Sequence, residues 1–197
     1  MKSLVTVATV LVFGFFSISS SAQYMGVRTG VGISNLITST NSNSTFGRLF
    51  SVHVGATIDF EIADRFWLQS GTTFFKKGGA NAFGNFNLYY LELPVTARFD
   101  FLEVGAEGIL YARAGFYSGM LLTANFNGTK LDVGSRPGDD FKFFDFGIIS
   151  GVGYGFNESI DVGLAVEFGF LNTDAEQSTV SLTNGAIMIT ANYRFGL

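Results

Sequence analysis

The chain has 197 residues and a net charge of −4; 14% of its residues are charged, 16% are aromatic, and it contains 23 Phe, 25 Gly and no Cys. Without any cluster of Lys or Arg, nucleic acid is excluded as a partner. Without Cys, disulfides, thiolate metal sites and a lipidated N-terminal cysteine are excluded. The low charge suggests a surface that is not wholly in water, yet no run of about 18 apolar residues follows the N-terminus, which excludes helical membrane spans.

Residues 1–22 have the composition of an export signal. Lys2 provides the positive start, residues 4–16 are an apolar stretch, and Ser20-Ser21-Ala22 resembles a cleavage site. We therefore predict a cleavable signal peptide over 1–22 and a single mature domain over 23–197.

The mature sequence alternates between apolar and polar residues with the two-residue period of β-strands. Residues 160–170 are the clearest case, since Ile160, Val162 and Leu164 begin one apolar face, while Asp161 and Glu167 lie on the other. Eight strands of this kind are predicted, most of them longer than the roughly 5–6 residues of an average soluble strand: 24–34, 48–62, 65–76, 87–101, 109–123, 145–157, 160–170 and 185–196.

The connections alternate in length. Short turns are expected at 63–64, 102–108 and 157–159, and longer polar loops at 35–47, 77–86, 124–144 and 171–183. Short turns at one end and long loops at the other are typical of outer-membrane barrels, whose turns face the periplasm. The sequence therefore predicts an all-β, eight-stranded, antiparallel, up-and-down transmembrane β-barrel.

The polar face of the strands combines charged residues with many glycines. Glycine weakens a strand and has no purpose on a wet outer face, but it leaves room for long side chains inside a narrow barrel. The lumen of an eight-stranded barrel is just wide enough to be filled by side chains. We therefore predict a buried ion-pair network that plugs the lumen, in which an arginine pairs with Glu167; the alternative is a narrow path for ions. Its predicted members are Arg28, Glu92, Arg98, Arg113, Asp161, Glu167 and Arg194.

Aromatic residues on the apolar face gather at the strand ends beside the short turns. Such barrels carry a girdle of aromatic side chains at each membrane interface. The periplasmic girdle is predicted to contain Phe60, Phe66, Phe99, Phe101, Tyr154, Phe156, Tyr193 and Phe195.

Other chemical groups give weaker signals. His53 has no nucleophile and acid in a known arrangement, so it is interpreted as a hydrogen-bonded lumen residue. The acidic residues in or beside the third long loop, Asp132, Asp139, Asp140 and Asp145, lack the spacing of a calcium loop, and a solvated acidic loop is the better interpretation. Pro94 lies inside a strand, where it removes one donor, and a local bulge is predicted there. Neither a catalytic nor a cofactor or metal site is predicted.

The central segment resembles a known family. Tyr90-Leu91-Glu92-Leu93-Pro94-Val95, followed by Leu110-Tyr111-Ala112-Arg113-Ala114-Gly115-Phe116, resembles the PorT-type, porin-family outer-membrane barrels of Bacteroidetes. The ending Tyr193-Arg194-Phe195 looks like the C-terminal signal read by the barrel-insertion machinery, although Gly196 and Leu197 follow it. The resemblance implies an integral outer-membrane protein, and some members of this family serve a secretion apparatus.

From these patterns we expect an integral outer-membrane barrel with a plugged lumen and a structural or partner-binding role, the competing function being a narrow pore for ions or small solutes. An enzyme is not expected. The expected partners are outer-membrane lipid, the barrel-insertion machinery during assembly and another envelope protein.

Overall fold

The structure, a computed structural model, describes residues 23–38, 46–136, 138–175 and 181–196. The predicted signal peptide lies outside the described residues. No helix in these four ranges is long and apolar enough to cross a membrane. The strands are β1 (Gln23–Thr38), β2 (Leu49–Ala63), β3 (Phe66–Asn81), β4 (Gly84–Val104), β5 (Gly108–Phe126), β6 (Thr129–Leu131), β7 (Phe144–Gly155), β8 (Ile160–Gly169) and β9 (Leu182–Gly196).

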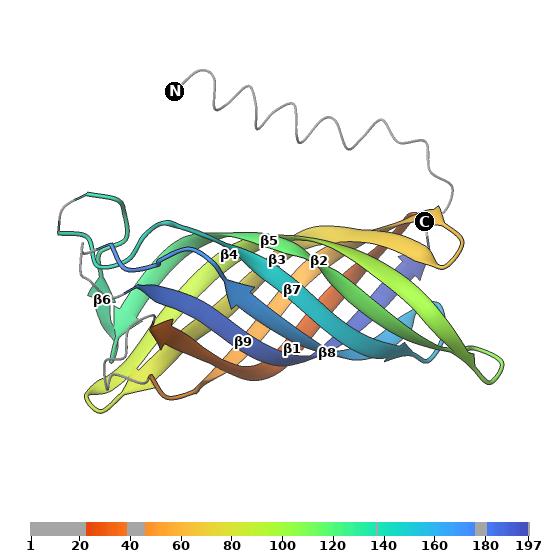
Figure 1. Cartoon of the computed structure of the whole chain (residues 1–197), viewed down its shortest axis with the longest axis horizontal. Helices are drawn as coiled ribbons and strands as arrows, with labels where there is room; N and C mark the ends of the chain where they lie inside the picture. Colours follow the sequence, from red (N-terminus) through yellow and green to blue (C-terminus); the bar gives the residue numbers. More distant parts are fainter. Residues whose placement is uncertain (1–22, 39–45, 137, 176–180, 197) are drawn as a thin grey trace, which may run out of the picture.

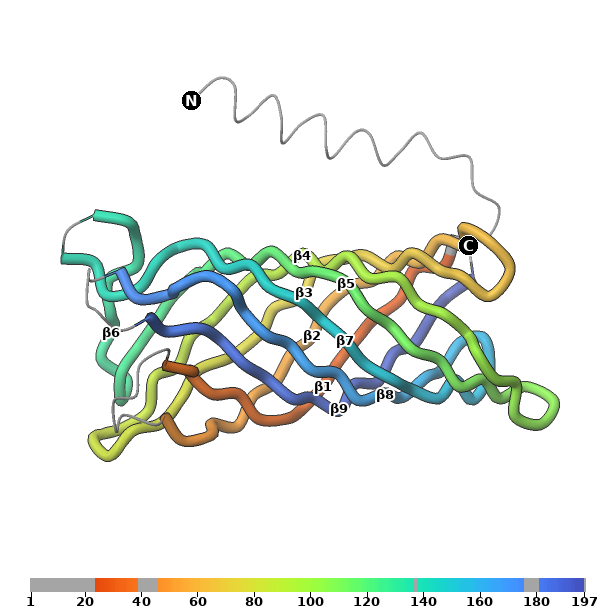
Figure 2. The backbone as a smooth tube through the Cα atoms, in the orientation of Figure 1, coloured from red at the N-terminus to blue at the C-terminus, as the bar shows by residue number. Residues whose placement is uncertain are grey.

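The strands form a closed barrel. Going round it, each strand pairs with its neighbour in the order β4, β3, β2, β1, β9, β8, β7, β5, and the pairing of β4 with β5 completes the ring. Short β6 lies outside this ring and pairs with the end of β5. All ring pairings are antiparallel, and the strands cross the barrel at a slant (Figure 2). The predicted eight-stranded, antiparallel, up-and-down barrel is confirmed.

The two ends of the barrel differ (Figure 1). The connections 64–65, 105–107 and 156–159 lie at one end, which we call the turn end, together with the start of β1 and the end of β9. The β3–β4 hairpin, β6 and the segment before β7 lie at the opposite end, which we call the loop end. Arg65 and Gly105 have positive φ angles of 65° and 72°, as tight turns require.

Two predicted loops contain strand residues, and the first of them is largely strand. Residues 77–86 were expected to be a loop, but β3 continues to Asn81 and β4 begins at Gly84, so that only 82–83 connect them. Within the predicted loop 124–144, Asn127 and Gly128 have φ angles of 49° and 88°. Two successive positive φ angles match the type I′ hairpin turn that Asn-Gly favours, and this turn returns the chain along β5 as β6.

The bulge predicted at Pro94 is wrong. Pairing of β3 with β4 stops between Ser70↔Val95 and Thr73↔Glu92, but the register is the same on both sides of the gap. The proline therefore omits ladder bonds on its β3 side without displacing the strand, and its carbonyl oxygen accepts a hydrogen bond from Ser70 Oγ at 3.0 Å. Register shifts occur elsewhere, between Glu61 and Ala63, Tyr89 and Tyr90, and Asp100 and Leu102.

The barrel is apolar outside and polar inside. In β8, Leu164 is 47% exposed, whereas Asp161 is 1% exposed. The same alternation runs along the other strands, with apolar side chains outward and charged side chains buried. Such a surface is stable only in contact with an apolar medium, because water would meet a continuous belt of Val, Leu, Ile and Phe.

Candidate functional site

The barrel lumen collects nearly all buried charges of the described chain. Because successive side chains of a strand point to opposite faces, every second side chain of the barrel points inward. Glycines among these inward positions leave space for long side chains to lie across the wall. All seven residues of the predicted lumen network are between 1% and 8% exposed: Arg28, Glu92, Arg98, Arg113, Asp161, Glu167 and Arg194. The structure does not join them into one network but divides them among three layers.

The layer nearest the turn end is centred on Asp161. Its carboxylate binds Arg194 at 2.5 Å and Arg98 at 3.5 Å. Arg98 also binds Asp100 at 2.6 Å, and Arg194 lies 3.7 Å from Asp59. Two guanidinium groups and three carboxylates thus connect β2, β4, β8 and β9 across the lumen.

Uncharged side chains complete the hydrogen bonding of this layer. Tyr111 donates its hydroxyl proton to Asp161 at 2.7 Å, and Asn192 donates a further bond to the same carboxylate. The guanidinium of Arg98 lies 4.0 Å from the centre of the Tyr111 ring. Asp161 therefore accepts from four side chains, which is the kind of saturation that a buried carboxylate needs.

A second charged layer lies toward the loop end and is centred on Lys77. Its ammonium is 2.6 Å from Glu92 and 2.7 Å from Glu167, and all three side chains are buried. The ammonium also lies 4.2 Å from the ring centre of Tyr117 and 4.6 Å from that of Phe75. The predicted arginine partner of Glu167 is thus wrong, because a lysine placed in a loop by sequence reasoning takes that position.

Above Lys77, a hydrogen-bonded layer around Asp145 joins β4, β5, β7 and β9. Asp145 accepts hydrogen bonds from Tyr117 at 3.0 Å and from Asn184 at 2.8 Å, and Asn184 also donates to the Tyr90 hydroxyl at 3.0 Å. Of these four, sequence reasoning assigned only Asp145 and Tyr90 to the inward face, and none to the network.

The loop end of the lumen is closed by apolar side chains. Phe141 reaches in from the segment between β6 and β7 and is 4% exposed. It is held there by backbone bridges to Val133 and Asp174. The buried members of this apolar cap are Leu36, Leu88, Tyr90, Leu121, Ala124 and Phe141.

Between the two charged layers lie Arg28 and Arg113, with uncharged partners. Arg28 donates from Nε to Asn192 at 2.5 Å, and Arg113 donates from Nη2 to Thr190 at 3.5 Å. His53 is buried at the same level, beside Gly30, and its ring packs against Phe75.

Most residues of the predicted periplasmic girdle lie exposed on the outer wall near the turn end. Phe66 and Phe99 stack with ring centres 4.5 Å apart. The pairs Tyr154–Phe156 and Tyr193–Phe195 contact edge to face at 5.0 Å. Phe101 is also exposed, whereas Phe60 is only 9% exposed. The girdle as a membrane interface stays a prediction.

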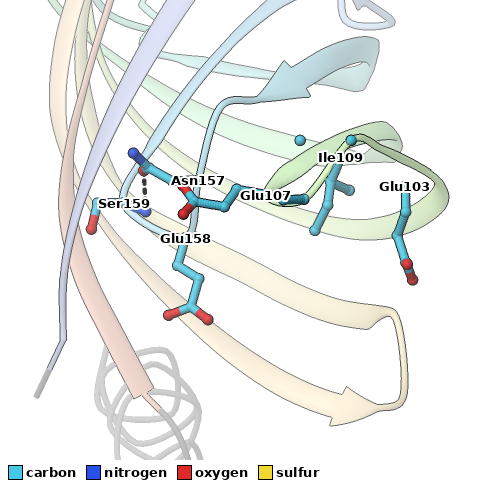
Figure 3. A pocket seen from close by; sticks show the side chains of 9 residues that line it. Glu103, Glu107, Ile109, Asn157, Glu158 and Ser159 are labelled. Atoms are coloured by element: carbon cyan, nitrogen blue, oxygen red, sulfur yellow. Dashed lines mark hydrogen bonds between the residues drawn. The ribbon is translucent and has the colours of Figure 1, made fainter.

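A groove of about 480 Å³ lies at the turn end between the β4–β5 and β7–β8 connections (Figure 3). Glu103, Glu107 and Glu158 line it, and Arg65 binds Glu103 at 2.7 Å. Within the described ranges, no group of three His, Asp or Glu side chains is placed to hold a metal ion. At the opposite end, the Asp139 and Asp140 carboxylates accept backbone N–H bonds from Arg136 and Asp132, so they serve the fold of their loop.

The sequence and the fold were compared with those of known proteins. A family model described as "Outer membrane protein beta-barrel domain" matches residues 22–175. A search of curated proteins found no match. Among solved structures, neisserial surface protein A has a TM-score of 0.52 at 15% identity, covering 89% of this chain and 100% of its own.

Two further solved structures are similar to the chain at lower scores. Ail, the attachment invasion locus protein of Yersinia pestis, has a TM-score of 0.46 at 16% identity, covering 89% of this chain and 100% of its own. Outer membrane protein W of E. coli has a TM-score of 0.45 at 15% identity, covering 90% of this chain and 100% of its own.

Proposed function

Because the chain belongs to the outer membrane protein β-barrel domain family and is located in the outer membrane, we propose that it is a closed barrel that acts as a membrane-embedded, non-enzymatic scaffold for a partner. The filled lumen supports this proposal most directly. Two charged layers with Arg28 and Arg113 between them, a hydrogen-bonded layer around Asp145 and an apolar cap follow one another along the axis. An ion that crosses the lumen would have to disrupt the side-chain contacts of each layer in turn, and the apolar cap provides no ligands for it.

The resemblance to PorT-type barrels belongs to this proposal. Its motif places Tyr90 and Glu92 in the lumen and Leu91, Leu93 and Val95 on the outer wall. The second segment similarly places Tyr111 and Arg113 inside. The inward residues of both motifs therefore belong to the plug. Association with a secretion apparatus is a partner-binding role that such a plugged barrel can serve.

Conductance separates the scaffold from the alternative, a narrow pore. We expect the purified barrel, inserted in a planar bilayer, to show no stepwise conductance, because side chains fill the lumen and an apolar cap closes its loop end. Steps whose size changes in Glu92→Gln, with Glu107→Gln at the exposed turn end as the control, would instead establish an ion path past the Lys77 layer.

The loop end offers a rigid surface for a partner. Phe83, at the tip of the β3–β4 hairpin, is 84% exposed. Asn81 Oδ1 accepts the backbone N–H of Phe83 at 2.9 Å, and Asn127 Nδ2 donates to the Phe83 carbonyl oxygen at 3.0 Å. The tips of two hairpins are thereby tied together. A large apolar side chain held in water on a fixed backbone is suited to bury itself against another protein.

We expect the barrel, extracted from its outer membrane in mild detergent, to migrate as a defined assembly larger than the monomer. Phe83→Ser should abolish this assembly without changing the unfolding temperature, whereas Phe83→Leu, which keeps an apolar side chain, should retain it. Native mass and mass spectrometry of the co-purified chains provide the measurement. If the Phe83→Ser variant forms an assembly of equal mass, Phe83 does not contact the partner, and the partner binds to the barrel wall or to another loop.

A further inference from the structure

The middle of the lumen contains two buried guanidinium groups without a direct counter-ion. Arg28 is 6% exposed and Arg113 is 5% exposed. Among the described residues, neither has a carboxylate oxygen within 4.0 Å, unlike Lys77, Arg98 and Arg194. A buried charge persists only when it is paired, so these two cations need a compensating group.

The strand register brings the two guanidinium groups close together. Arg28 lies opposite Asn192 on β9 and bonds to it, while Arg113 reaches from β5 to Thr190, two residues earlier on the same strand. Inward positions two residues apart are about 7 Å apart along a strand. Arg28 is within electrostatic range of Arg113, which repels it.

Glycines let a third group converge on the same point. A Cβ on Gly151 would lie 3.3 Å from Arg113 Nε, so the guanidinium passes over that bare position toward Thr190. A Cβ on Gly30, which pairs with Thr190, would lie 2.5 Å from His53 Nε2. The imidazole and the guanidinium therefore approach Thr190 from opposite sides of β9.

Polar atoms at this point have no hydrogen-bond partner. Arg113 Nη1 and His53 Nε2 are both buried and unpartnered. The Thr190 hydroxyl makes only long contacts, 3.5 Å to Arg113 Nη2 and 3.4 Å to the Gly163 carbonyl oxygen. Arg113 Nη1 thus has a donor without an acceptor near the rotatable Thr190 hydroxyl, and His53 Nε2 adds a second donor in the tautomer that is protonated at this nitrogen.

The neighbouring carboxylates are already engaged. Asp161 holds Arg194 and Arg98, and Glu92 and Glu167 hold Lys77. Asp59 and Asp161 attract Arg28 only at longer range. Each flanking layer holds one carboxylate more than its cations, but this excess acts on the middle layer only across a distance. A direct counter-ion for the two guanidinium groups is not provided by the described residues and would have to come from outside the chain.

We propose that Arg113, Arg28, His53 and Thr190 bind a small monovalent anion of the halide class, chloride in the cell, in the middle of the lumen. The donors are the Arg113 Nη1–H, the His53 Nε2–H and the Thr190 hydroxyl, and Arg28 supplies the second positive charge. A halide ion is small, accepts hydrogen bonds from several directions and needs no hydrogen-bond partner on the side that faces away from these donors. The inference does not depend on whether the barrel binds another protein.

The test uses the whole folded barrel in detergent, dialysed into sodium chloride or sodium gluconate of equal ionic strength. We expect the unfolding temperature to be about 2–4 °C higher in chloride and the gain to saturate with chloride concentration. Arg113→Met should remove the gain, while Arg136→Met, at an exposed loop position, should keep it. His53→Phe, which keeps a ring of similar size, should reduce the gain and provides a second variant if Arg113→Met does not fold.

Bromide gives a direct readout in the unaltered protein. Crystals grown in sodium bromide should show an anomalous peak within hydrogen-bonding distance of Arg113 Nη1 and Thr190 Oγ1. Equal unfolding temperatures in chloride and gluconate, a chloride gain that persists in Arg113→Met, or bromide peaks confined to the protein surface would each overturn the proposal.

Discussion

We expect Lys77→Met to lower the free energy of unfolding of the barrel by about 3–5 kcal/mol, the usual cost of removing one partner from a buried ion pair. The substitution leaves Glu92 and Glu167 facing each other with no cation within 4.0 Å, because both contact Lys77 alone among the charged side chains of the described ranges. Urea unfolding in detergent, followed by the fluorescence of the single tryptophan, measures the change.

The same strand provides a matched control. Lys76 precedes Lys77 and is not buried, so Lys76→Met should change the stability by no more than about 0.5 kcal/mol. Glu167→Gln should destabilise less than Lys77→Met, since Glu92 still pairs with the lysine. A loss below about 1 kcal/mol for Lys77→Met, the range of an exposed pair, would show that water reaches this layer and that the lumen is not plugged there.

Asp161→Asn is expected to have a comparable effect at the other end of the lumen, again about 3–5 kcal/mol. The substitution keeps the shape of the side chain but removes the charge between Arg98 and Arg194, and it replaces an acceptor of four side-chain bonds with a group that accepts at one atom only. Thermal and urea unfolding in detergent report the loss.

Glu158→Gln is the control for this layer, because Glu158 is exposed in the turn just before β8. It should leave the stability within about 0.5 kcal/mol of the unaltered barrel. If Asp161→Asn behaves like Glu158→Gln, the four contacts to Asp161 contribute little, and Asp59 and Asp100 suffice to compensate the two arginines.

The barrel itself could be predicted from the sequence because the strand period decides which residues point inward. Arg28, Glu92 and Asp161 alternate with apolar neighbours over long stretches, so the two-residue period of the strands predicts that they are buried. Partners could not be predicted in this way, since a pairing between β3 and β8 depends on side-chain reach across the lumen. For this reason the sequence did not predict that Glu167 forms its ion pair with Lys77 rather than with an arginine.

Two local sequence patterns indicate strands inside the predicted loops 77–86 and 124–144, but the polar, Gly-rich composition of these segments favoured a loop. Residues 77–86 are rich in Gly and Asn and were interpreted as a loop, yet the alternation of Thr73 and Phe75 continues to Lys77. Asn127-Gly128 is a strong hairpin signal that predicts the turn into β6. In both cases the strands extend past the length of roughly 9–11 residues that crosses a bilayer.

The pairing of β1 with β9, which runs from Tyr24↔Gly196 to Thr38↔Leu182, also determines when the molecule can fold. The two strands that close the ring are far apart in the sequence, so β1 lacks one of its two neighbours until β9 has been synthesised. A nascent chain that stops before β9 leaves the edges of β1 and β8 unpaired, and a bilayer tolerates no open edge. Closure of the barrel must therefore follow the synthesis of β9, and until then the apolar faces of the strands are exposed to aggregation.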